Sequence, residues 1–147
     1  MSVFARILVP VDFSDCSRRA LEMALEMRAV FQAELRVVHV WQPPEFAGAE
    51  LMVMAHSEGI SVGEYGQQQA SVALQQLLAE CGAEGVQAEV VVGDPRHSIV
   101  ELAKRYDSDL IIVGTHGRTG RARMFAGSVA EAVVRRAHVP VMTVRAA

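Results

Sequence analysis

The chain has 147 residues, of which 51% are hydrophobic and 21% charged, with a formal net charge of −3. This size and composition fit one globular domain spanning residues 1–147 and exclude a disordered chain. The acidic balance argues against a general binder of nucleic acid or anionic membrane. No apolar run is long enough for a membrane span. Cys16 and Cys81 cannot form a disulfide framework, so we expect buried free thiols and a cytoplasmic location.

The first half of the chain alternates short apolar runs with one amphipathic segment. Residues 6–11 are continuously apolar after Arg6, which is typical of a strand buried on both faces. Ser14 or Asp15 is suited to cap the helix that follows. Residues 35–40 are rich in β-branched side chains and predict a second strand.

A long irregular loop is expected over residues 41–63, which two prolines open and three glycines interrupt. Met52 and Met54 lie within it. They form either an adaptable contact surface or a cover for the edge of the sheet, and the sequence favours neither reading.

The helical period returns at Glu64 and continues as one apolar stripe to Cys81, with Gly82 where the helix should stop. A third strand is expected over residues 86–92. Asp94 and Pro95 then form the start of a helix that ends near Asp107.

The last third of the chain completes the alternation. A fourth strand is predicted over residues 109–114, a helix opening at Gly127 and Ser128, and a fifth strand over residues 139–144. Strands that alternate with helices imply right-handed crossovers. The fold class is therefore α/β: a Rossmann-like, five-stranded parallel sheet with helices on both faces.

The loop after the fourth strand carries the strongest chemical signal. Gly114 and Gly117 precede Gly127 and Ser128, which stand at a predicted helix N-terminus. Glycines let a backbone approach a phosphate closely, and the orphan N–H groups of a helix N-terminus attract anions. Three arginines between the two halves could neutralise phosphate charge or contact a partner protein: Arg118, Arg121 and Arg123. The alternative is a flexible loop followed by an ordinary cap.

Other nucleotide motifs are absent. The chain has no P-loop sequence, and no G-x-G-x-x-G follows the first strand. The five histidines show no metal-ligand spacing with each other or with the cysteines, so no protein metal site is expected. We interpret His39 as a hydrogen-bonded core residue and His116 as a solvent-facing loop residue rather than a proton-transfer group.

Several of these segments together resemble the ATP-binding branch of the universal stress protein family. The glycines and Ser128 match its G-x2-G-x9-G-[S/T] motif. The likeness covers nearly the whole chain, and its further matches are residues 7–14, 38–40, 93–95 and 109–117. Phe13 stands where the family often has a small residue, which would alter the adenine side of the pocket.

The resemblance implies a set of nucleotide-binding residues and ATP, with Mg²⁺, as the ligand. Pro10, Val11 and Asp12 would border the adenine, with Asp12 bonding the base or ribose and the backbone of Val40 contacting the ring. Gly114 would lie near the ribose. The phosphates would be held by Gly117, Arg118, Thr119, Gly127, Ser128 and Val129. The resemblance also implies a homodimer paired through strand 139–144, whose apolar edge needs cover.

Three functions follow as hypotheses. The first is a homodimeric ATP-binding protein that uses the nucleotide as a signal or structural cofactor, read by protein partners. Because residues 114–128 contain no carboxylate, we expect slow hydrolysis or none. The alternatives are a slow ATPase or nucleotidyl-transfer enzyme and an interaction module that binds no nucleotide.

Overall fold

The computed structural model describes residues 3–43, 52–55, 58–116 and 127–146. In chain order its elements are β1 (Arg6–Pro10), α1 (Asp15–Phe31), β2 (Glu34–Trp41), β3 (Met52–Ala55), β4 (Glu58–Ser61), α2 (Val62–Glu80), β5 (Gln87–Val92), α3 (Pro95–Arg105), β6 (Leu110–Gly114), α4 (Ser128–Arg136) and β7 (Val141–Val144).

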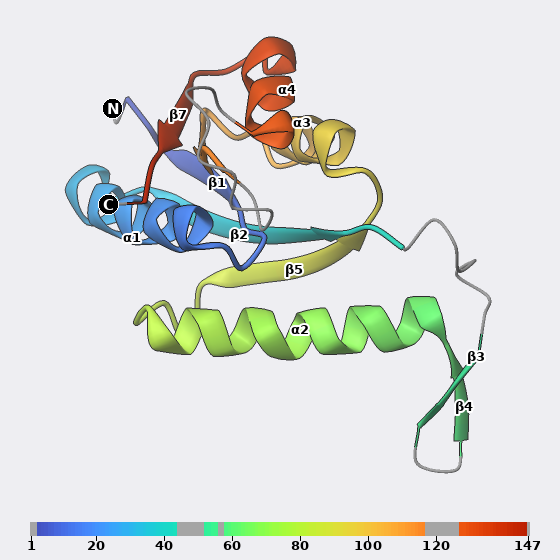
Figure 1. Cartoon of the computed structure of the whole chain (residues 1–147). Helices are drawn as coiled ribbons and strands as arrows, with labels where there is room; N and C mark the ends of the chain where they lie inside the picture. The colour runs from blue at the N-terminus through green and yellow to red at the C-terminus, as the bar shows by residue number, and fades with distance from the viewer. Residues whose placement is uncertain (1–2, 44–51, 56–57, 117–126, 147) are drawn as a thin grey trace.

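The main sheet is parallel and has the strand order β5-β2-β1-β6-β7 (Figure 1). The predicted α/β fold is confirmed. After β1, the chain moves outward to β2 and β5, then crosses back to place β6 and β7 on the other side of β1. The strand order therefore reverses between β1 and β6, and the helices that follow those two strands, α1 and α4, cover opposite faces of the sheet.

Successive residues of the strands supply two separate hydrophobic cores. In β1, Ile7 and Val9 face a cluster that includes Leu21 of α1 and Leu74 of α2. Leu8 faces the opposite cluster, with residues of α3 and α4. Because β1 is covered on both faces, its sequence after Arg6 is continuously apolar, as buried parallel strands require.

The predicted helix boundaries are confirmed at three positions. Ser14 is the N-cap of α1, and its hydroxyl accepts the N–H of Ser17. Asp94 caps α3 with Pro95 in the first turn. Gly82 follows the end of α2 with φ +70°, a conformation that glycine adopts without steric cost.

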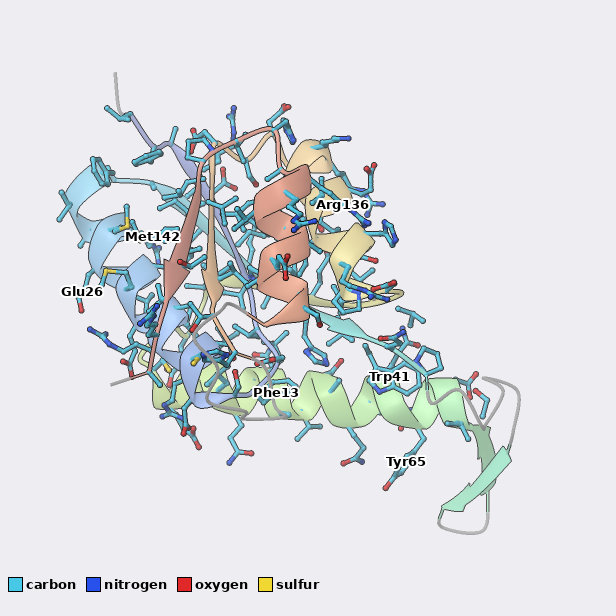
Figure 2. All side chains as sticks on the ribbon, turned by 45° about the horizontal axis from the view of Figure 1, so that its top comes forward. Phe13, Glu26, Trp41, Tyr65, Arg136 and Met142 are labelled. Atoms are coloured by element: carbon cyan, nitrogen blue, oxygen red, sulfur yellow. The ribbon has the colours of Figure 1, made fainter. Side chains whose placement is uncertain are left out.

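The prediction of an irregular loop over residues 41–63 was wrong in part. Trp41 completes β2, β3 and β4 form an antiparallel hairpin, and α2 begins at Val62. In Figure 1 the hairpin extends beyond the N-terminal end of α2. Trp41 lies against α2, where its ring meets the backbone of Gly66 (Figure 2). The glycines near the hairpin suggested a loop, but β3 and β4 pair in spite of them.

The final strand is shorter than expected. It begins at Val141, whereas residues 139–144 were predicted. Pro140 has no N–H to donate and contributes only its carbonyl, which accepts the N–H of Ile111 at 3.1 Å. Among the helices of the described residues, none has the length and apolar character to span a bilayer.

Candidate functional site

A cavity of about 410 Å³ opens at the carboxyl ends of β1, β2 and β6, where the strand order reverses. Ligand sites of α/β sheets occupy this position, and this volume falls in the range of small-molecule pockets. The start of α3 and the start of α4 complete its wall. It is lined by Pro10, Val11, Asp12, Ser17, Val40, Gln42, Pro95, Ile99, Val113, Gly114, Thr115, His116, Gly127, Ser128, Val129 and Ala130.

The structure brings most of the predicted site residues together around this cavity. Of the expected set, Pro10, Val11, Asp12, Val40, Gly114, Gly127, Ser128 and Val129 line it. The three others, Gly117, Arg118 and Thr119, lie outside the described residues. Segments that are far apart in the sequence thus converge on one cavity at the strand ends.

Sequence reasoning missed several lining residues. Pro95 and Ile99 come from α3, one helical turn apart, and Asp94–Pro95 had already marked that helix start next to a strand end. His116 also lines the cavity and is half-buried. The others that were missed are Ser17, Gln42, Val113, Thr115 and Ala130.

One part of the cavity is apolar. Val11 and Val113 are buried at the ends of β1 and β6, Val40 is buried at the end of β2, and Ile99 is buried on α3. Val40 of β2 and Ile99 of α3 belong to one buried cluster, and their aliphatic side chains suit a flat, weakly polar ring. Such a surface gives affinity by burying apolar area and gives little orientation by itself.

Another part of the cavity contains the N-terminus of α4. Gly127 is the N-cap residue and provides no side-chain acceptor for the first turn of the helix. Its own N–H donates to the carbonyl of Thr115, which fixes the start of α4 against the end of β6. The uncapped N–H groups of the first turn, together with the helix dipole, favour an anion at this position.

Gly114 has a packing role that the sequence did not reveal. A Cβ at this position would lie 2.7 Å from both the carbonyl carbon of Cys16 and the nitrogen of Ser17. These are backbone atoms of α1, so they cannot move aside as a side chain would. Only glycine lets β6 approach the first turn of α1 this closely. This contact brings Ser17 to the cavity.

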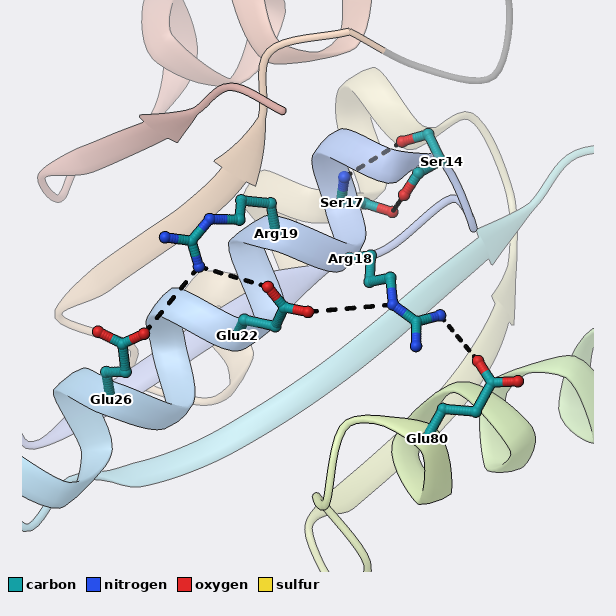
Figure 3. Close-up of polar contacts among 7 residues, drawn as sticks. All are labelled: Ser14, Ser17, Arg18, Arg19, Glu22, Glu26 and Glu80. Atoms are coloured by element: carbon teal, nitrogen blue, oxygen red, sulfur yellow. Dashed lines mark hydrogen bonds and ion pairs between the residues drawn. The ribbon is translucent and has the colours of Figure 1, made fainter. Parts of the chain in front are cut away.

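Asp12 is held at the cavity by a turn of hydrogen bonds. The N–H of Ser14 donates to Oδ1 of Asp12 at 3.0 Å, and the Ser14 hydroxyl also contacts this oxygen. Ser17 joins the same network, since its hydroxyl accepts the N–H of Asp12 at 3.2 Å (Ser14 and Ser17 are shown in Figure 3). Among the described residues no partner is seen for Oδ2, which leaves one carboxylate oxygen for a ligand.

Phe13 has a different environment from the one expected. Its ring packs against His39, with 4.5 Å between the ring centroids, and against the core beneath α1 and α2. It is not among the residues that line the cavity, so the expected effect on the cavity is not seen. Its φ of +66° is rare for a bulky residue. The packing of the ring and the hydrogen bond from Ser14 to Asp12, which spans Phe13, stabilise this conformation.

His39 is confirmed as a hydrogen-bonded core residue. Its Nδ1 lies 2.7 Å from the carbonyl oxygen of Val11. Because a carbonyl only accepts, Nδ1 carries the proton and donates. The bond fixes the backbone of Val11 one residue before Asp12, so His39 positions the cavity wall from the opposite face of the sheet.

The charge content of the cavity is low within the described residues. Asp12 is the only carboxylate that lines it there, and no group of three or more His, Cys, Asp or Glu gathers among the described residues to hold a metal ion. The described part of the wall therefore offers hydroxyl, amide and backbone groups rather than a preformed metal centre.

The comparisons with known proteins identify the family. Residues 4–145 match the model of the universal stress protein family. The chain belongs to that family. Universal stress protein MJ0531 of Methanocaldococcus jannaschii is 32% identical over 98% of this chain and 84% of its own length.

Two solved structures of family-like proteins superpose over nearly the whole chain. Hypothetical protein MJ0577 of Methanocaldococcus jannaschii has a TM-score of 0.74 and 26% identity, covering 97% of this chain and 96% of its own. A universal stress protein in complex with cAMP has a TM-score of 0.71 and 25% identity, with both chains covered completely.

Proposed function

We propose that this universal stress protein binds ATP in the cavity between β1, β6 and α4, as a signal or structural cofactor that protein partners read. One observation carries the proposal: an apolar slot and an uncapped helix N-terminus form the two parts of one cavity. An adenine nucleotide has the same division, with a flat ring at one end and phosphates at the other. The related structure in complex with cAMP supports an adenine nucleotide as the ligand class.

The residues fit the parts of such a ligand. Val40 and Ile99 offer apolar contact to the adenine, and the free oxygen of Asp12 offers an acceptor to the ribose or the base. Ser128 and Val129 would offer backbone N–H groups to the phosphates and Ser128 also a hydroxyl, while Gly127, whose N–H is bonded to Thr115, would let the phosphates approach without a side chain. We assign Gly114 near the ribose, and Gly117, Arg118 and Thr119 to the phosphates as the family motif implies.

We further propose that hydrolysis is slow or absent. Phosphoryl transfer to water needs a group that positions the water and, in most enzymes, carboxylates that hold Mg²⁺ near the γ-phosphate. Asp12, the only carboxylate of the described wall, belongs to the adenine and ribose end. Mg²⁺ would therefore be held mainly by the phosphates themselves, where it would neutralise their charge. ADP release at about 1 s⁻¹ or faster would contradict this assignment.

The first experiment is to identify the nucleotide in freshly purified protein, by acid precipitation and anion-exchange chromatography. Near-stoichiometric ATP supports the proposal, and ADP alone favours the slow ATPase. If no nucleotide is found, MgATP is added in a thermal melt. Saturation at 100 times the dissociation constant stabilises the folded state by about 2.7 kcal/mol, a rise in Tm of a few degrees. An unchanged Tm supports the interaction module instead.

A pair of variants at Gly127 separates binding from folding. Its backbone, with φ −60° and ψ 164°, is open to any residue. Gly127→Asp supplies a better cap for α4 and also places a negative charge where the phosphates would lie. We expect the ATP-dependent rise in Tm to disappear although the free protein melts no lower. Gly127→Ser, the neutral control, keeps the rise. An equal response in both variants would place the phosphates elsewhere.

We also propose a homodimer through β7 and a cytoplasmic location. β7 pairs with β6 alone among the described strands and so presents an open edge. Both cysteines are free thiols, as suits a reducing compartment, although Cys81 is only half-buried. Light scattering on the purified protein measures the mass. Thr143→Pro, which removes an N–H at the edge, should shift the dimer to a monomer.

A further inference from the structure

A small recess lies at the amino ends of β1 and β2, beside the C-terminal end of α3. We call it the amino-end recess. It has a volume of about 70 Å³ and is lined by Arg6, Ile7, Glu34, Arg36, Tyr106 and Ser108. The cavity of the candidate site opens at the other end of the same strands. β1, which is about 16 Å long, separates the two, so the recess is a different place on the molecule.

Ser108 is a buried polar residue of this recess, and only 5% of it is exposed. Its backbone N–H donates to the carbonyl of Ala103, but its hydroxyl makes no hydrogen bond with any described residue. Within the described chain, the only side-chain atom that is both sealed from solvent and unpaired is Oε1 of Glu89, so the Ser108 hydroxyl opens into the recess. Buried hydroxyls nearly always have a partner, and this one must therefore find its partner inside the recess.

Two arginines extend from neighbouring strands into the same space. Arg36 is the register partner of Leu8, which packs beneath α3, and Arg6 lies two residues before Leu8, so both arginines are on the α3 face of the sheet. Among the described residues, neither arginine forms an ion pair. Arg6 donates its Nε–H to the carbonyl of Asp107 at 2.8 Å, which orients the guanidinium and leaves its terminal nitrogens available.

Arg36 is held in place by an aromatic ring rather than by a carboxylate. Its guanidinium carbon lies 4.1 Å from the centroid of the Tyr106 ring. A cation over an aromatic face is attracted by the ring without donating a hydrogen bond to it. The N–H donors of Arg36 therefore remain available, on a group whose position is already fixed. A ligand that binds to such a group loses less side-chain entropy than one that must first order a free arginine.

We propose that the amino-end recess binds a phosphate group, with Arg6, Arg36 and the Ser108 hydroxyl as its hydrogen-bond donors. A phosphate monoester carries about 1.5 to 2 negative charges at pH 7 and presents three acceptor oxygens, which suits two arginines and a hydroxyl. A carboxylate has one charge and only two oxygens, both in one plane. A single water molecule requires about 10–15 Å³, so the recess has room for a group of several atoms.

Acidic residues near the recess set the expected strength of binding. Of the described residues that line it, Glu34 is the one carboxylate, and it is exposed. The carboxylate of Asp109 accepts the backbone N–H groups of Ala5 and Arg6 and is engaged there. The lining thus has two arginines and one carboxylate, a net charge of +1. Because Glu34 opposes the arginines, we expect a dissociation constant for phosphate on the order of 1 mM.

A titration followed by NMR tests the proposal residue by residue. Inorganic phosphate is added to the full-length, ¹⁵N-labelled chain up to about 20 mM, with chloride used to keep the ionic strength constant. We expect saturable shifts of the Ser108 amide signal and of the arginine Nε–H signals of Arg6 and Arg36. Phosphate at the N-terminus of α4 would instead shift the Ser128 signal, so the two sites are distinguished. Shifts that do not saturate at Ser108 and Arg36 would overturn the proposal.

Substitutions in the lining separate a built site from a general attraction of charge. Ser108→Ala should weaken phosphate binding about tenfold, and Tm should not fall because the fold loses no hydrogen bond. Arg36→Lys keeps the charge but loses the planar donors and should also bind more weakly. Arg105→Gln is the control, since Arg105 is an exposed arginine of α3 that does not line the recess. If Arg105→Gln weakens binding as much as Ser108→Ala does, the assignment is wrong.

The same titration with other anions identifies the form of the ligand. Glycerol 3-phosphate carries the phosphate group on a carbon chain. If it binds more tightly than inorganic phosphate, the recess takes a phosphate monoester, and otherwise it takes the inorganic ion. Acetate is the carboxylate control, and tighter binding of acetate would contradict the choice of phosphate. Glu34→Gln removes the opposing charge and should strengthen phosphate binding severalfold. Weaker binding by this variant would count against the proposal.

Discussion

The indole of Trp41 occupies the space that a side chain at Gly66 would fill. A Cβ at Gly66 would lie 2.8 Å from Cη2 of the ring and closer still to two other ring atoms. Trp41 ends β2, and its neighbours Val40 and Gln42 line the cavity. The contact therefore joins one edge of the cavity to the N-terminal half of α2.

Gly66→Ala should destabilise the protein although alanine is the better helix former. The propensity gain is about 1 kcal/mol, but the new methyl group collides with the ring and costs about 1–3 kcal/mol. Urea denaturation measures the net change. In a Trp41→Leu background the same substitution should be neutral or stabilising, because the ring is gone. A loss of stability in that background would show that the collision is not with Trp41.

Gly114→Ala should cost more than Gly93→Ala. A Cβ at Gly114 meets backbone atoms of α1, whereas a Cβ at Gly93 would meet only the Ser98 hydroxyl, at 2.5 Å, which can rotate away. We expect a loss of about 1–3 kcal/mol at Gly114 and much less at Gly93. Thermal melts compare the two. Gly93→Ala with Ser98→Ala removes even that contact and serves as the control.

The free energy of unfolding should decrease as the pH is lowered below about 4, because Asp94 becomes protonated there. Hydrogen bonds from the Arg96 side chain, and then from its backbone N–H, hold the pKa of Asp94 below its ordinary value. A depressed carboxylate pKa contributes stability above the unfolded-state pKa, and this contribution is lost as pH falls through the folded-state pKa. Asp94→Asn keeps an acceptor for capping but has no charge to lose. Its Tm should therefore depend less on pH between about 4 and 2, in a comparison of thermal melts.

Ser14→Ala should weaken both α1 and the cavity. The hydroxyl caps α1, donates to Oδ1 of Asp12 and lies 3.3 Å from the carbonyl oxygen of His116. Loss of the cap costs about 1 kcal/mol. If Asp12 contacts the nucleotide, ATP affinity falls as well, because the carboxylate loses its support. Ser14→Thr retains the hydroxyl and should restore both properties. Calorimetric titration with MgATP measures the change in ATP affinity, and a thermal melt measures the change in stability.

Local chemistry explains what could be predicted from the sequence. Leu8 and Val9 face different cores, so β1 has no polar side. Its continuously apolar sequence therefore predicts a buried parallel strand. Ser14 and Asp94 are recognisable caps because the N–H groups they satisfy lie two or three residues along the chain. The cavity position followed from strand ends and a helix start, which are also local features.

Tertiary contacts explain what could not be predicted. Ser17 reaches the cavity only because Gly114 lets β6 approach α1, a relationship between residues far apart in the sequence. Phe13 adopts positive φ because His39 and the core hold its ring, which no local rule indicates. The β3–β4 hairpin contains Gly59, a poor strand former, and its pairing overrides that preference.

The order β5-β2-β1-β6-β7 also determines when during folding the cavity comes into existence. One wall comes from segments that end by residue 42, and the other from segments that begin at residue 95. An intermediate in which β6 has not yet paired with β1 has only half of a site and gains nothing from a ligand. Bound nucleotide would therefore stabilise only the sheet in which β6 is paired with β1. On addition of nucleotide, amide hydrogen exchange in β6 should slow as much as exchange in β1.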